Sequence, residues 1–525
     1  MKFVNLYLMK INIDFIKSRL LNLFSNSMFL IPLGILVSCN NSNQLEKTNA
    51  GFNERPNILI LMSDNQSAEH LGCYGDNSVK TPNIDQLAEN GVLFNNAFCS
   101  APSCSPARAA MLSGQDIWRL KQAANLWSSF PKVKVFTRLL EDDGYKVGIQ
   151  GKGWGPGNSK ISGWDKNPGG EKYDSFKSFF EQTKKDNPWF YWYSSTDPHR
   201  PFRKDGWKNS GINLDSIFVP PYLPDNIETR KDIADYYDEI QIFDAEVGTY
   251  VSFLKEKNEL ENTIIIICSD NGWQMPRGLA NLYDFGTKIP LIVYWPKKFK
   301  SGRSIDDFVN LKDFAPTFLE IANIKIPEEM NSNSFLDLLV SPKEGNINKK
   351  RNSVIMGRER HAFVREDGKG YPGRAIRTKE FLYIRNYNPE RWPAGDPPLY
   401  GDVDSHMLQY DAPTKVNILR RKLLNKIDPF FDLAFGKRPK EELFDLKNDP
   451  YQLNNLSYDK RYLSIKDSLS STLNAYLESS GDPRENGIEY DWDSAYYFEE
   501  NDKKPKPSKK YIDLLGLKSE YNYLK

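Results

Sequence analysis

The stretch Asn57-Ile-Leu-Ile-Leu-Met62 is a continuous apolar run that ends at the polar triplet Ser63-Asp64-Asn65. Three later runs have the same design: KVGIQ at 146–150, WFYWYS at 189–194 and TIIIIC at 263–268. Continuous apolar runs of this length are typical of strands that are covered on both faces. Between them, helical spacing predicts helices at 81–90, 135–143, 229–257 and 312–322. The sequence therefore predicts an α/β fold with a large mixed β-sheet flanked by helices.

Each of these runs is followed by a polar residue that could serve a functional site. The four residues are Asp64, Lys152, His199 and Asp270. Open α/β sheets place their sites beyond the carboxyl ends of the strands, so we expect these side chains to share one edge of the sheet. The alternative is that Asp and Asn merely begin the turns that follow strands.

The pattern changes after about residue 342, where charged and aromatic residues increase and apolar runs shorten. Segments 381–384 and 442–446 predict strands of a small antiparallel sheet, and 458–479 predicts a helix packed on it. We expect a larger domain at 54–350 and a smaller C-terminal α+β subdomain at 351–525, with a four-stranded antiparallel sheet and a helix.

Composition limits the classes of function. The chain has 525 residues, of which 39% are hydrophobic, and a net charge of +1. This balance gives no basic surface for nucleic acid, so we expect no nucleic-acid partner. Mean hydropathy is −0.59, and no apolar stretch reaches the roughly 20 residues of a membrane span.

The N-terminus has the features of a targeting segment. Lys10, Lys17 and Arg19 precede an apolar run at 28–37, which is followed by Ser38-Cys39 and a polar tract. The end of the run resembles a bacterial lipobox. It predicts a lipoprotein signal peptide at 1–39, lipidation of Cys39, a polar linker at 40–53 and anchoring to a membrane of the bacterial cell envelope, in the periplasm or at the outer membrane. An ordinary secretory signal is the alternative.

Several oxygen ligands lie at the predicted sheet edge. Asp64, Asn65, Asp270 and Asn271 follow two of the apolar runs. Hard oxygen ligands suit calcium. Zinc is disfavoured because the chain has four His and no His or Cys pair at ligand spacing.

The run Ser103-Cys-Ser-Pro-Ala-Arg108 contains the pattern Cys-x-Pro-x-Arg. It resembles the signature at which sulfatases oxidise a cysteine to formylglycine, whose hydrate is a geminal diol. In a helix that begins near Ser105, Arg108 would return to the face of Cys104 and could stabilise a developing alkoxide. Lys152 would neutralise sulfate oxygens, and His199 could protonate the leaving atom.

With these residues in place, the chain resembles a type I sulfatase of the alkaline phosphatase superfamily over roughly 56–456. The matching stretches are NILILMSDNQ, GCYGD, TPNIDQLAENGVLFNNAF, CSPARAAMLSG, GIQGKG, DPHRP, ICSDNG, IPLIVYWP and ELFDLKNDPYQLNNL. VPPYLPDNIETRKDIADYYDEI, MPRGLANLYD and RAIRTKEFLYIRNYNPERW look like the branch that contains N-sulfoglucosamine sulfohydrolase.

The resemblance implies an enzyme that removes sulfate from a sulfated oligosaccharide, as an O-sulfate ester or a glucosamine N-sulfate. It also implies calcium and a formylglycine produced from Cys104 by a formylglycine-generating enzyme. It assigns metal roles to Asp64, Asp270, Asn271 and the modified Cys104. Catalytic roles fall to Cys104, Arg108, Lys152 and His199.

Three positions depart from the family pattern. Asn65 replaces a second Asp in many relatives, Trp154 stands where His often follows the lysine, and Leu279 stands where Lys or Arg is usual. Arg277 is close enough in sequence to substitute for the missing cation. We expect Arg277, Trp154, Arg358, Arg374 and His361 to form the substrate-binding residues, because arginines hold sulfate and carboxylate groups bidentately.

Two other functions remain open at this point. One is a phosphoester or phosphonate hydrolase of the same superfamily, which the shortage of His disfavours. The other is a catalytically impaired surface lipoprotein that binds glycans, which the departures at Asn65, Trp154 and Leu279 favour.

Overall fold

The computed structural model describes residues 55–184, 187–402, 412–425 and 427–498. The predicted signal peptide, Cys39 and most of the polar linker lie outside these residues. All the elements below belong to one unit, residues 51–525. No helix in the described ranges is both long enough and apolar enough to cross a bilayer.

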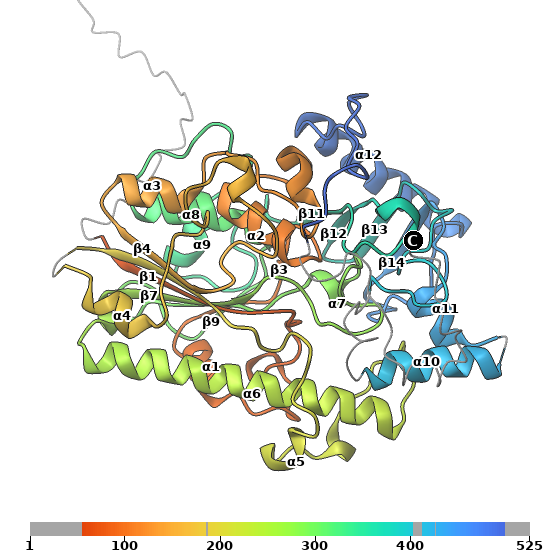
Figure 1. Ribbon diagram of the computed structural model, residues 1–525, viewed down its shortest axis with the longest axis horizontal. Helices are drawn as coiled ribbons and strands as arrows, with labels where there is room; N and C mark the ends of the chain where they lie inside the picture. The colour runs from red at the N-terminus through yellow and green to blue at the C-terminus, as the bar shows by residue number, and fades with distance from the viewer. Residues whose placement is uncertain (1–54, 185–186, 403–411, 426, 499–525) are drawn as a thin grey trace, which may run out of the picture. The chain divides into compact units, whose positions relative to one another are not determined.

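The core of the molecule is an eight-stranded mixed sheet in the order β5-β4-β6-β1-β7-β8-β2-β9 (Figure 1). The strands are β1 Asn57–Ser63, β2 Val92–Phe94, β4 Lys146–Gly151, β5 Glu171–Lys172, β6 Trp189–Ser194, β7 Thr263–Ser269, β8 Leu291–Tyr294 and β9 Arg303–Ile305. Strand β1 lies between β6 and β7, parallel to both, and every one of its residues is buried. Its continuous apolar sequence is explained by this central position.

Helices cover both faces of the large sheet, with α1 and α6 on one face and α2, α3 and α8 on the other (Figure 1). The helices are α1 Pro82–Glu89, α2 Cys104–Ser113, α3 Phe136–Asp142, α4 Phe176–Glu181, α5 Trp207–Ser210, α6 Ile227–Glu256, α7 Asp284–Thr287, α8 Phe314–Ile321, α9 Leu336–Val340, α10 Pro413–Leu424, α11 Pro429–Phe435 and α12 Leu463–Ser479. The long helix α6 begins at a side-chain cap, because Asn226 accepts a hydrogen bond from the backbone N–H of Thr229 at 2.9 Å.

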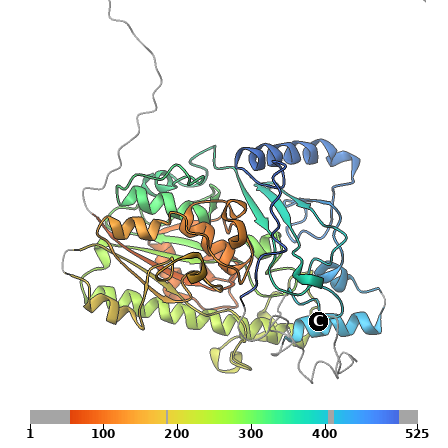
Figure 2. The same cartoon turned by 45° about the horizontal axis from the view of Figure 1, so that its top comes forward.

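A second, four-stranded antiparallel sheet has the order β11-β12-β13-β14. Its strands are β11 Ser353–Arg358, β12 Gly373–Thr378, β13 Phe381–Asn386 and β14 Glu441–Asp445. Helix α12 covers one face of this sheet (Figure 2), where Leu473 and Leu477 share a buried cluster with Tyr383 and Leu443. A two-stranded sheet pairs β3 Ala97–Phe98 with β10 Val309–Asn310.

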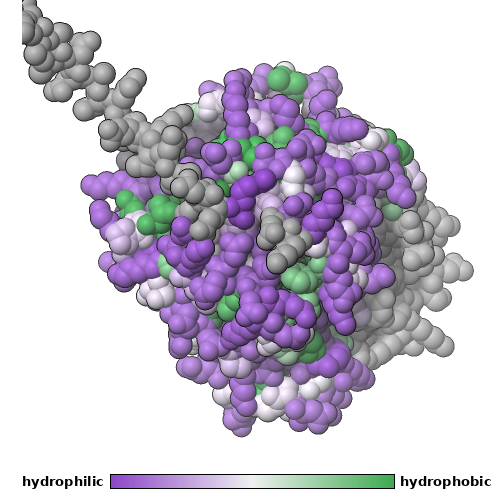
Figure 3. All heavy atoms as spheres, turned by 90° about the vertical axis from the view of Figure 1, so that its left-hand side faces the viewer, coloured by the Kyte–Doolittle hydropathy of each residue, from purple (hydrophilic) through white to green (hydrophobic). Residues whose placement is uncertain are grey.

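The predicted fold class is therefore confirmed. The four apolar runs form β1, β4, β6 and β7. The helical segments 81–90, 135–143 and 312–322 contain α1, α3 and α8, and 229–257 overlaps α6, which begins two residues earlier. The division at 350/351 stays a prediction, although all strands of the large sheet precede it and all strands of the small sheet follow it. The face on the side of α3 and α4 is mostly hydrophilic, with scattered apolar residues (Figure 3).

Candidate active site

Two buried carboxylates lie side by side at the carboxyl edge of the large sheet. Strands β1 and β7 pair in register up to Ser63 and Ser269, so Asp64 and Asp270 leave the sheet at the same level. Neither residue is exposed to solvent. The backbone N–H of Asn65 donates to Asp270 Oδ1 at 3.1 Å, which ties the two strand ends together.

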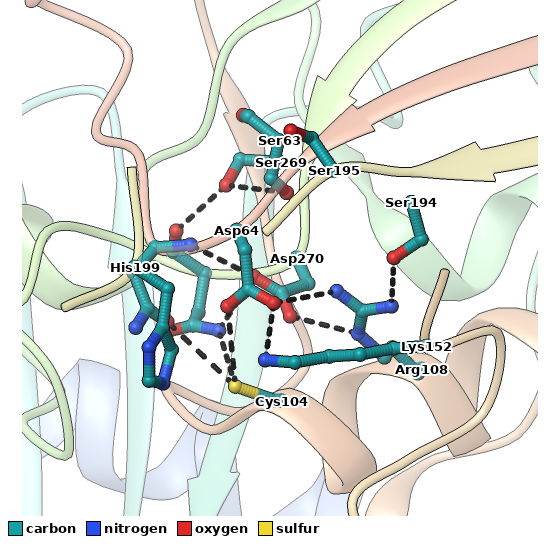
Figure 4. Close-up of polar contacts among 12 residues, drawn as sticks. Ser63, Asp64, Cys104, Arg108, Lys152, Ser194, Ser195, His199, Ser269 and Asp270 are labelled. Carbon is teal, nitrogen blue, oxygen red and sulfur yellow. Dashed lines mark hydrogen bonds and ion pairs between the residues drawn. The ribbon is translucent and has the colours of Figure 1, made fainter. Parts of the chain in front are cut away.

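Cys104 is the first residue of α2, and its sulfur faces this pair of strand ends (Figure 4). Its Sγ lies 3.6 Å from Asp64 Oδ1 and 3.7 Å from Asn65 Oδ1, and Asn271 Nδ2 lies 3.8 Å from it. The residue is 4% exposed. The loop before α2 therefore brings the Cys-x-Pro-x-Arg cysteine to the acidic strand ends.

Arg108 lies one helical turn after Cys104 and binds both carboxylates. Its Nε donates to Asp270 Oδ2 at 2.8 Å and its Nη2 to Asp64 Oδ2 at 3.2 Å. Its Nη1 donates to Gly153 O at 2.9 Å and to Ser194 Oγ at 2.5 Å. A fully buried guanidinium with this many acceptors is held in one orientation.

Lys152 and His199 complete the group of strand-end residues. Lys152 follows β4 and its Nζ forms an ion pair with Asp64, while a quarter of its side chain remains exposed. His199 follows β6 and is half-buried, with Nδ1 2.5 Å from the carbonyl oxygen of Arg200. A carbonyl oxygen only accepts, so Nδ1 carries the hydrogen in this contact. Figure 4 shows both residues beside Asp64 and Cys104.

The charges in this cluster shift one another's proton affinities. Burial raises the pKa of the Cys104 thiol well above its ordinary value, and Asp270 and Asp64 raise it further. A thiol in this environment is a poor nucleophile at neutral pH. Burial and Asp64 also raise the pKa of Asp270. Although burial lowers the pKa of Arg108, Asp270 and Asp64 raise it above its usual value, so the guanidinium stays charged.

The donor set fits a divalent cation. One ligand atom from each of Asp64, Cys104 and Asp270 lies within 4.8 Å of the others, and all three residues are buried. The side-chain oxygen Asn271 Oδ1 is also buried and has no hydrogen-bond partner among the described residues. A cation held by these oxygens would offset the repulsion between the two carboxylates, and hard oxygen ligands favour calcium or magnesium over softer metals.

The three departures from the family pattern have distinct environments. Asn65 has a φ of 63° and donates through Nδ2 to Gln274 Oε1 at 3.2 Å. Trp154 is buried, and its Nε1 donates to the carbonyl oxygen of Ser105 at 3.2 Å. Leu279 is 3% exposed. Trp154 therefore supports the helix that carries Cys104, and its ring stacks on Phe130. Its expected contact with substrate stays a prediction.

The three arginines expected to bind substrate are instead occupied by protein partners. Arg277 donates to the carbonyl oxygens of Leu433 and Gln452. Arg358 and Arg374 are also buried. Arg358 pairs with Asp402 at 2.5 Å; Arg374 pairs with Asp482 at 2.6 Å and Glu359 at 2.8 Å. Arg374 is a wholly buried guanidinium with two carboxylates, which is the environment of a structural ion pair, and its role in substrate binding stays a prediction.

His361, by contrast, lies next to the nucleophile position. Its Nδ1 is 2.8 Å from Ser103 Oγ, and Ser103 directly precedes Cys104. The residue is 6% exposed. Its proposed contact with substrate stays a prediction, but the structure brings it to the segment that carries Cys104.

Sequence reasoning missed Ser103 and Ser194 as members of the site. Ser194 is the last residue of the apolar run at 189–194 and accepts from Arg108. Its position at the end of a predicted strand was the available signal. Ser103 gave none, because its contact with His361 joins residues 258 positions apart.

Comparison with known proteins agrees with this geometry. A family model described as Sulfatase matches residues 56–324, and a model described as N-sulphoglucosamine sulphohydrolase, C-terminal, matches residues 277–399. An ulvan-active sulfatase of Formosa agariphila is 29% identical over 463 residues, which cover 84% of this chain and 83% of that protein. The N-sulphoglucosamine sulphohydrolase of Homo sapiens is 27% identical over 478 residues, covering 81% and 91%.

A solved structure shows the same fold. BT4656, in complex with its substrate D-glucosamine-2-N,6-O-disulfate, superposes with a TM-score of 0.58 at 19% identity. The match covers 83% of this chain and 100% of that one. The family model spans more than half of the 525 residues, from β1 through α8. The chain belongs to the sulfatase family.

Proposed function

We propose that this protein is a formylglycine-dependent sulfatase that uses calcium to release sulfate from sulfated saccharides. The observation that carries the proposal is the placement of Cys104. It lies at the first turn of α2, with its sulfur 3.6 Å from Asp64 and with Arg108 bound to both Asp64 and Asp270. Site residues from four strand ends and one helix therefore converge on the one cysteine of the family signature.

A formylglycine at position 104 supplies a hydrated aldehyde as nucleophile, and calcium supplies positive charge for the sulfate oxygens. Asp64, Asp270 and Asn271 would hold the metal, with Asn65 as a further amide oxygen. The modification would come from a formylglycine-generating enzyme. Loss of a second carboxylate at position 65 reduces the negative charge of the ligand set.

Arg108 and Lys152 would stabilise the charge that develops during reaction. The guanidinium of Arg108 is fixed by Asp64 and Asp270 before substrate arrives, so it needs no reorganisation. Lys152 is partly exposed and its ammonium group lies beside Asp64, where it can face an incoming anion. Both groups favour an anionic substrate at this edge of the sheet.

His199 would handle the proton of the leaving group. Because Nδ1–H is engaged with the carbonyl oxygen of Arg200, a protonated ring can donate from Nε2. His199 itself is half-buried at this edge of the sheet. A nitrogen or oxygen leaving atom would be protonated in the same way.

We infer the substrate class from chemistry and from the relatives together. The two curated relatives act on ulvan and on N-sulphoglucosamine, by their names. A sulfated oligosaccharide of algal or glycosaminoglycan type is therefore the proposed substrate, as an O-sulfate ester or a glucosamine N-sulfate, with His361 beside it. We propose a location in the cell envelope, with a lipid on Cys39 as the membrane anchor.

The test is sulfate release from defined ulvan, heparin and chondroitin oligosaccharides by protein that was co-expressed with a formylglycine-generating enzyme. We expect turnover on at least one sulfated saccharide, its loss in Cys104→Ala, and its loss after chelation with recovery on added calcium. Turnover of Cys104→Ala equal to that of the parent protein would refute the assignment. Faster hydrolysis of an aryl phosphate than of an aryl sulfate would instead identify a phosphoester hydrolase.

A second candidate is a glycan-binding protein that retains the fold without the chemistry. The buried apolar side chains of Leu279 and Trp154, which occupy two positions where relatives often have cations or His, favour it. It predicts saccharide affinity that survives Cys104→Ala and no sulfate release by the parent protein.

A further inference from the structure

A small cavity lies between the loop that follows Asn271 and the four-stranded sheet. Its volume is about 20 Å³, space for one or two water-sized groups but not for a sugar ring. The residues that line it and matter here are Asn281, Tyr283, Arg358, Tyr371, Arg438 and Glu442. They come from the 277–283 loop, the end of β11, strand β14 and two connecting segments.

Three hydrogen-bond donors in the cavity wall have no partner among the described residues. They are Arg358 Nε, Arg438 Nε and the hydroxyl of Tyr371, and all three atoms are buried. Arg358 is 5% exposed and Tyr371 3%. A buried donor without an acceptor destabilises the folded state. Three such donors around one cavity therefore indicate an acceptor that they share.

The charges around the cavity are unbalanced. The guanidinium groups are those of Arg277, Arg358, Arg365 and Arg438, and the buried carboxylates are those of Asp402 and Glu442. Asp402 is bound to both Arg358 and Arg365, whereas Glu442 accepts from Tyr283 and Asn386. Four positive and two negative charges leave two positive charges uncompensated.

The surroundings of Arg358 are consistent with this excess. Burial lowers the pKa of its guanidinium to about 10, although Asp402 raises it, and the neighbouring Arg365 lowers it further. Asp432, whose backbone carbonyl accepts from Arg438, has a side chain that is 62% exposed and lies 3.9 Å from Lys422. Among the residues that line the cavity, Glu442 is the one carboxylate, and it already accepts from Tyr283 and Asn386.

We propose that this cavity binds one small anion, a halide or a carboxylate group, held by Arg358, Arg438 and Tyr371. A water molecule fits less well, because it accepts only two hydrogen bonds and the two guanidinium nitrogens would use both. An anion accepts from all three and also offsets the charge excess. Its source is either the solvent or the acidic group of a bound saccharide.

The cavity walls connect to the segment that carries Cys104. The backbone N–H of Ala280 donates to the carbonyl oxygen of Pro102 at 2.9 Å, and that of Gly357 donates to Ser100 at 3.0 Å. Gly357 directly precedes Arg358. An anion in the cavity would therefore stabilise both elements that support the 100–104 segment.

Thermal unfolding of the full chain tests the proposal without any turnover, in a Cys104→Ala background. Sodium bromide, sodium acetate and sodium glucuronate are compared at equal ionic strength with sodium methanesulfonate, whose anion is neither a halide nor a carboxylate. We expect bromide or acetate to raise the Tm by about 1 °C or more. A rise with glucuronate alone would identify a saccharide acid as the source.

Two variants separate the cavity from general salt effects. Tyr371→Phe removes one donor and should at least halve the shift. Tyr145→Phe removes another buried hydroxyl for which the described part of the chain offers no hydrogen-bond partner. Tyr145 directly precedes β4, outside the cavity, and its substitution should leave the shift unchanged. Bromide-soaked crystals should show an anomalous peak between Arg358, Arg438 and Tyr371.

The proposal is overturned if none of the three anions changes the Tm relative to methanesulfonate, or if Tyr371→Phe and Tyr145→Phe give the same shift as the parent. Because these readouts need no sulfate release, a negative result leaves the proposed sulfatase activity to be judged on its own test.

Discussion

At the scale of single residues, the most constrained side chain is Arg108. It spans Asp64 and Asp270 with two different nitrogens, at 3.2 and 2.8 Å. An ammonium group cannot make both contacts from one position. The guanidinium therefore sets the orientation of both carboxylates and of the positive charge next to position 104.

Arg108→Lys should consequently reduce kcat for sulfate release by about 10²–10³, measured on the best saccharide of the release screen. Arg119→Lys makes the same change at a residue that binds Gln115 and the backbone of Glu329, outside the site, and should leave kcat unchanged. Equal activity of the two variants would contradict the role given to Arg108.

Asn65 determines how much negative charge surrounds the proposed metal. Its φ of 63° is tolerated by Asp as well as Asn. Asn65→Asp should tighten calcium binding about tenfold, because affinity rises with the number of charged ligands. Isothermal titration measures it, with Asn90→Asp at the exposed end of α1 as control. A weaker affinity in Asn65→Asp would show that residue 65 does not face the metal.

Glu239 introduces a pH dependence of stability. Burial and the neighbouring Asp197 raise the pKa of Glu239 to about 7 from 4.5. The folded protein therefore holds this proton more tightly than the unfolded chain. The stabilisation is fully present below pH 4.5 and is lost as the pH rises toward 7.

The Tm of Glu239→Gln, measured against pH, should thus decline less than that of the parent protein across this window. Glu228→Gln, at an exposed position in the first turn of α6, should follow the parent curve. If the Tm values of the parent protein and of Glu239→Gln differ by the same amount at every pH, Glu239 does not bind the extra proton.

At the scale of elements, helix α12 contacts a buried ion pair that lies next to α8, one of the helices that cover the large sheet. Lys312, which lies before α8, binds Asp116 at 2.5 Å and the hydroxyl of Tyr476 in α12 at 2.7 Å. Asp116→Ala should cost about 3–5 kcal/mol, because it leaves Lys312 buried without its carboxylate.

Urea unfolding measures the loss of stability. Glu329→Ala is the control, because it breaks the exposed ion pair between Lys134 and Glu329 at 3.1 Å. That pair should contribute less than about 1 kcal/mol. Similar losses in the two variants would mean that water reaches Lys312.

The elements also show why part of the fold was predictable. The runs that became β1, β4, β6 and β7 are buried on both faces, so hydrophobicity alone marks them. Strands β2 and β9 have three residues each, and β8 has four. Such short segments carry too little pattern to be distinguished from loops, and their place in the sheet depends on packing between distant parts of the chain.

The same distinction holds for the site. Asp64 and Asp270 could be placed together because parallel neighbouring strands end at one edge. The substrate role expected for Arg374 came from its neighbours in sequence, but its guanidinium binds Asp482, 108 positions away. A partner at that separation is set by the tertiary fold and leaves no local signal.

At the scale of the whole molecule, the large sheet and helix α2 both contribute residues to the candidate active site. The large sheet presents Asp64, Asp270, Lys152 and His199 at one edge, and α2 brings Cys104 and Arg108 to the same place. Calcium should therefore stabilise the fold as well as support activity. Chelation should lower the Tm, and calcium should restore it, by mass action on the folded state. An unchanged Tm with saturating calcium would argue against a metal at this edge.

The central claim is that Cys104 becomes the nucleophile after conversion to formylglycine. Mass spectrometry of the peptide that carries Cys104, from protein co-expressed with a formylglycine-generating enzyme, tests it most directly. The account predicts the mass of formylglycine at position 104 in protein that releases sulfate. An unmodified thiol at position 104 in protein that still releases sulfate would contradict it.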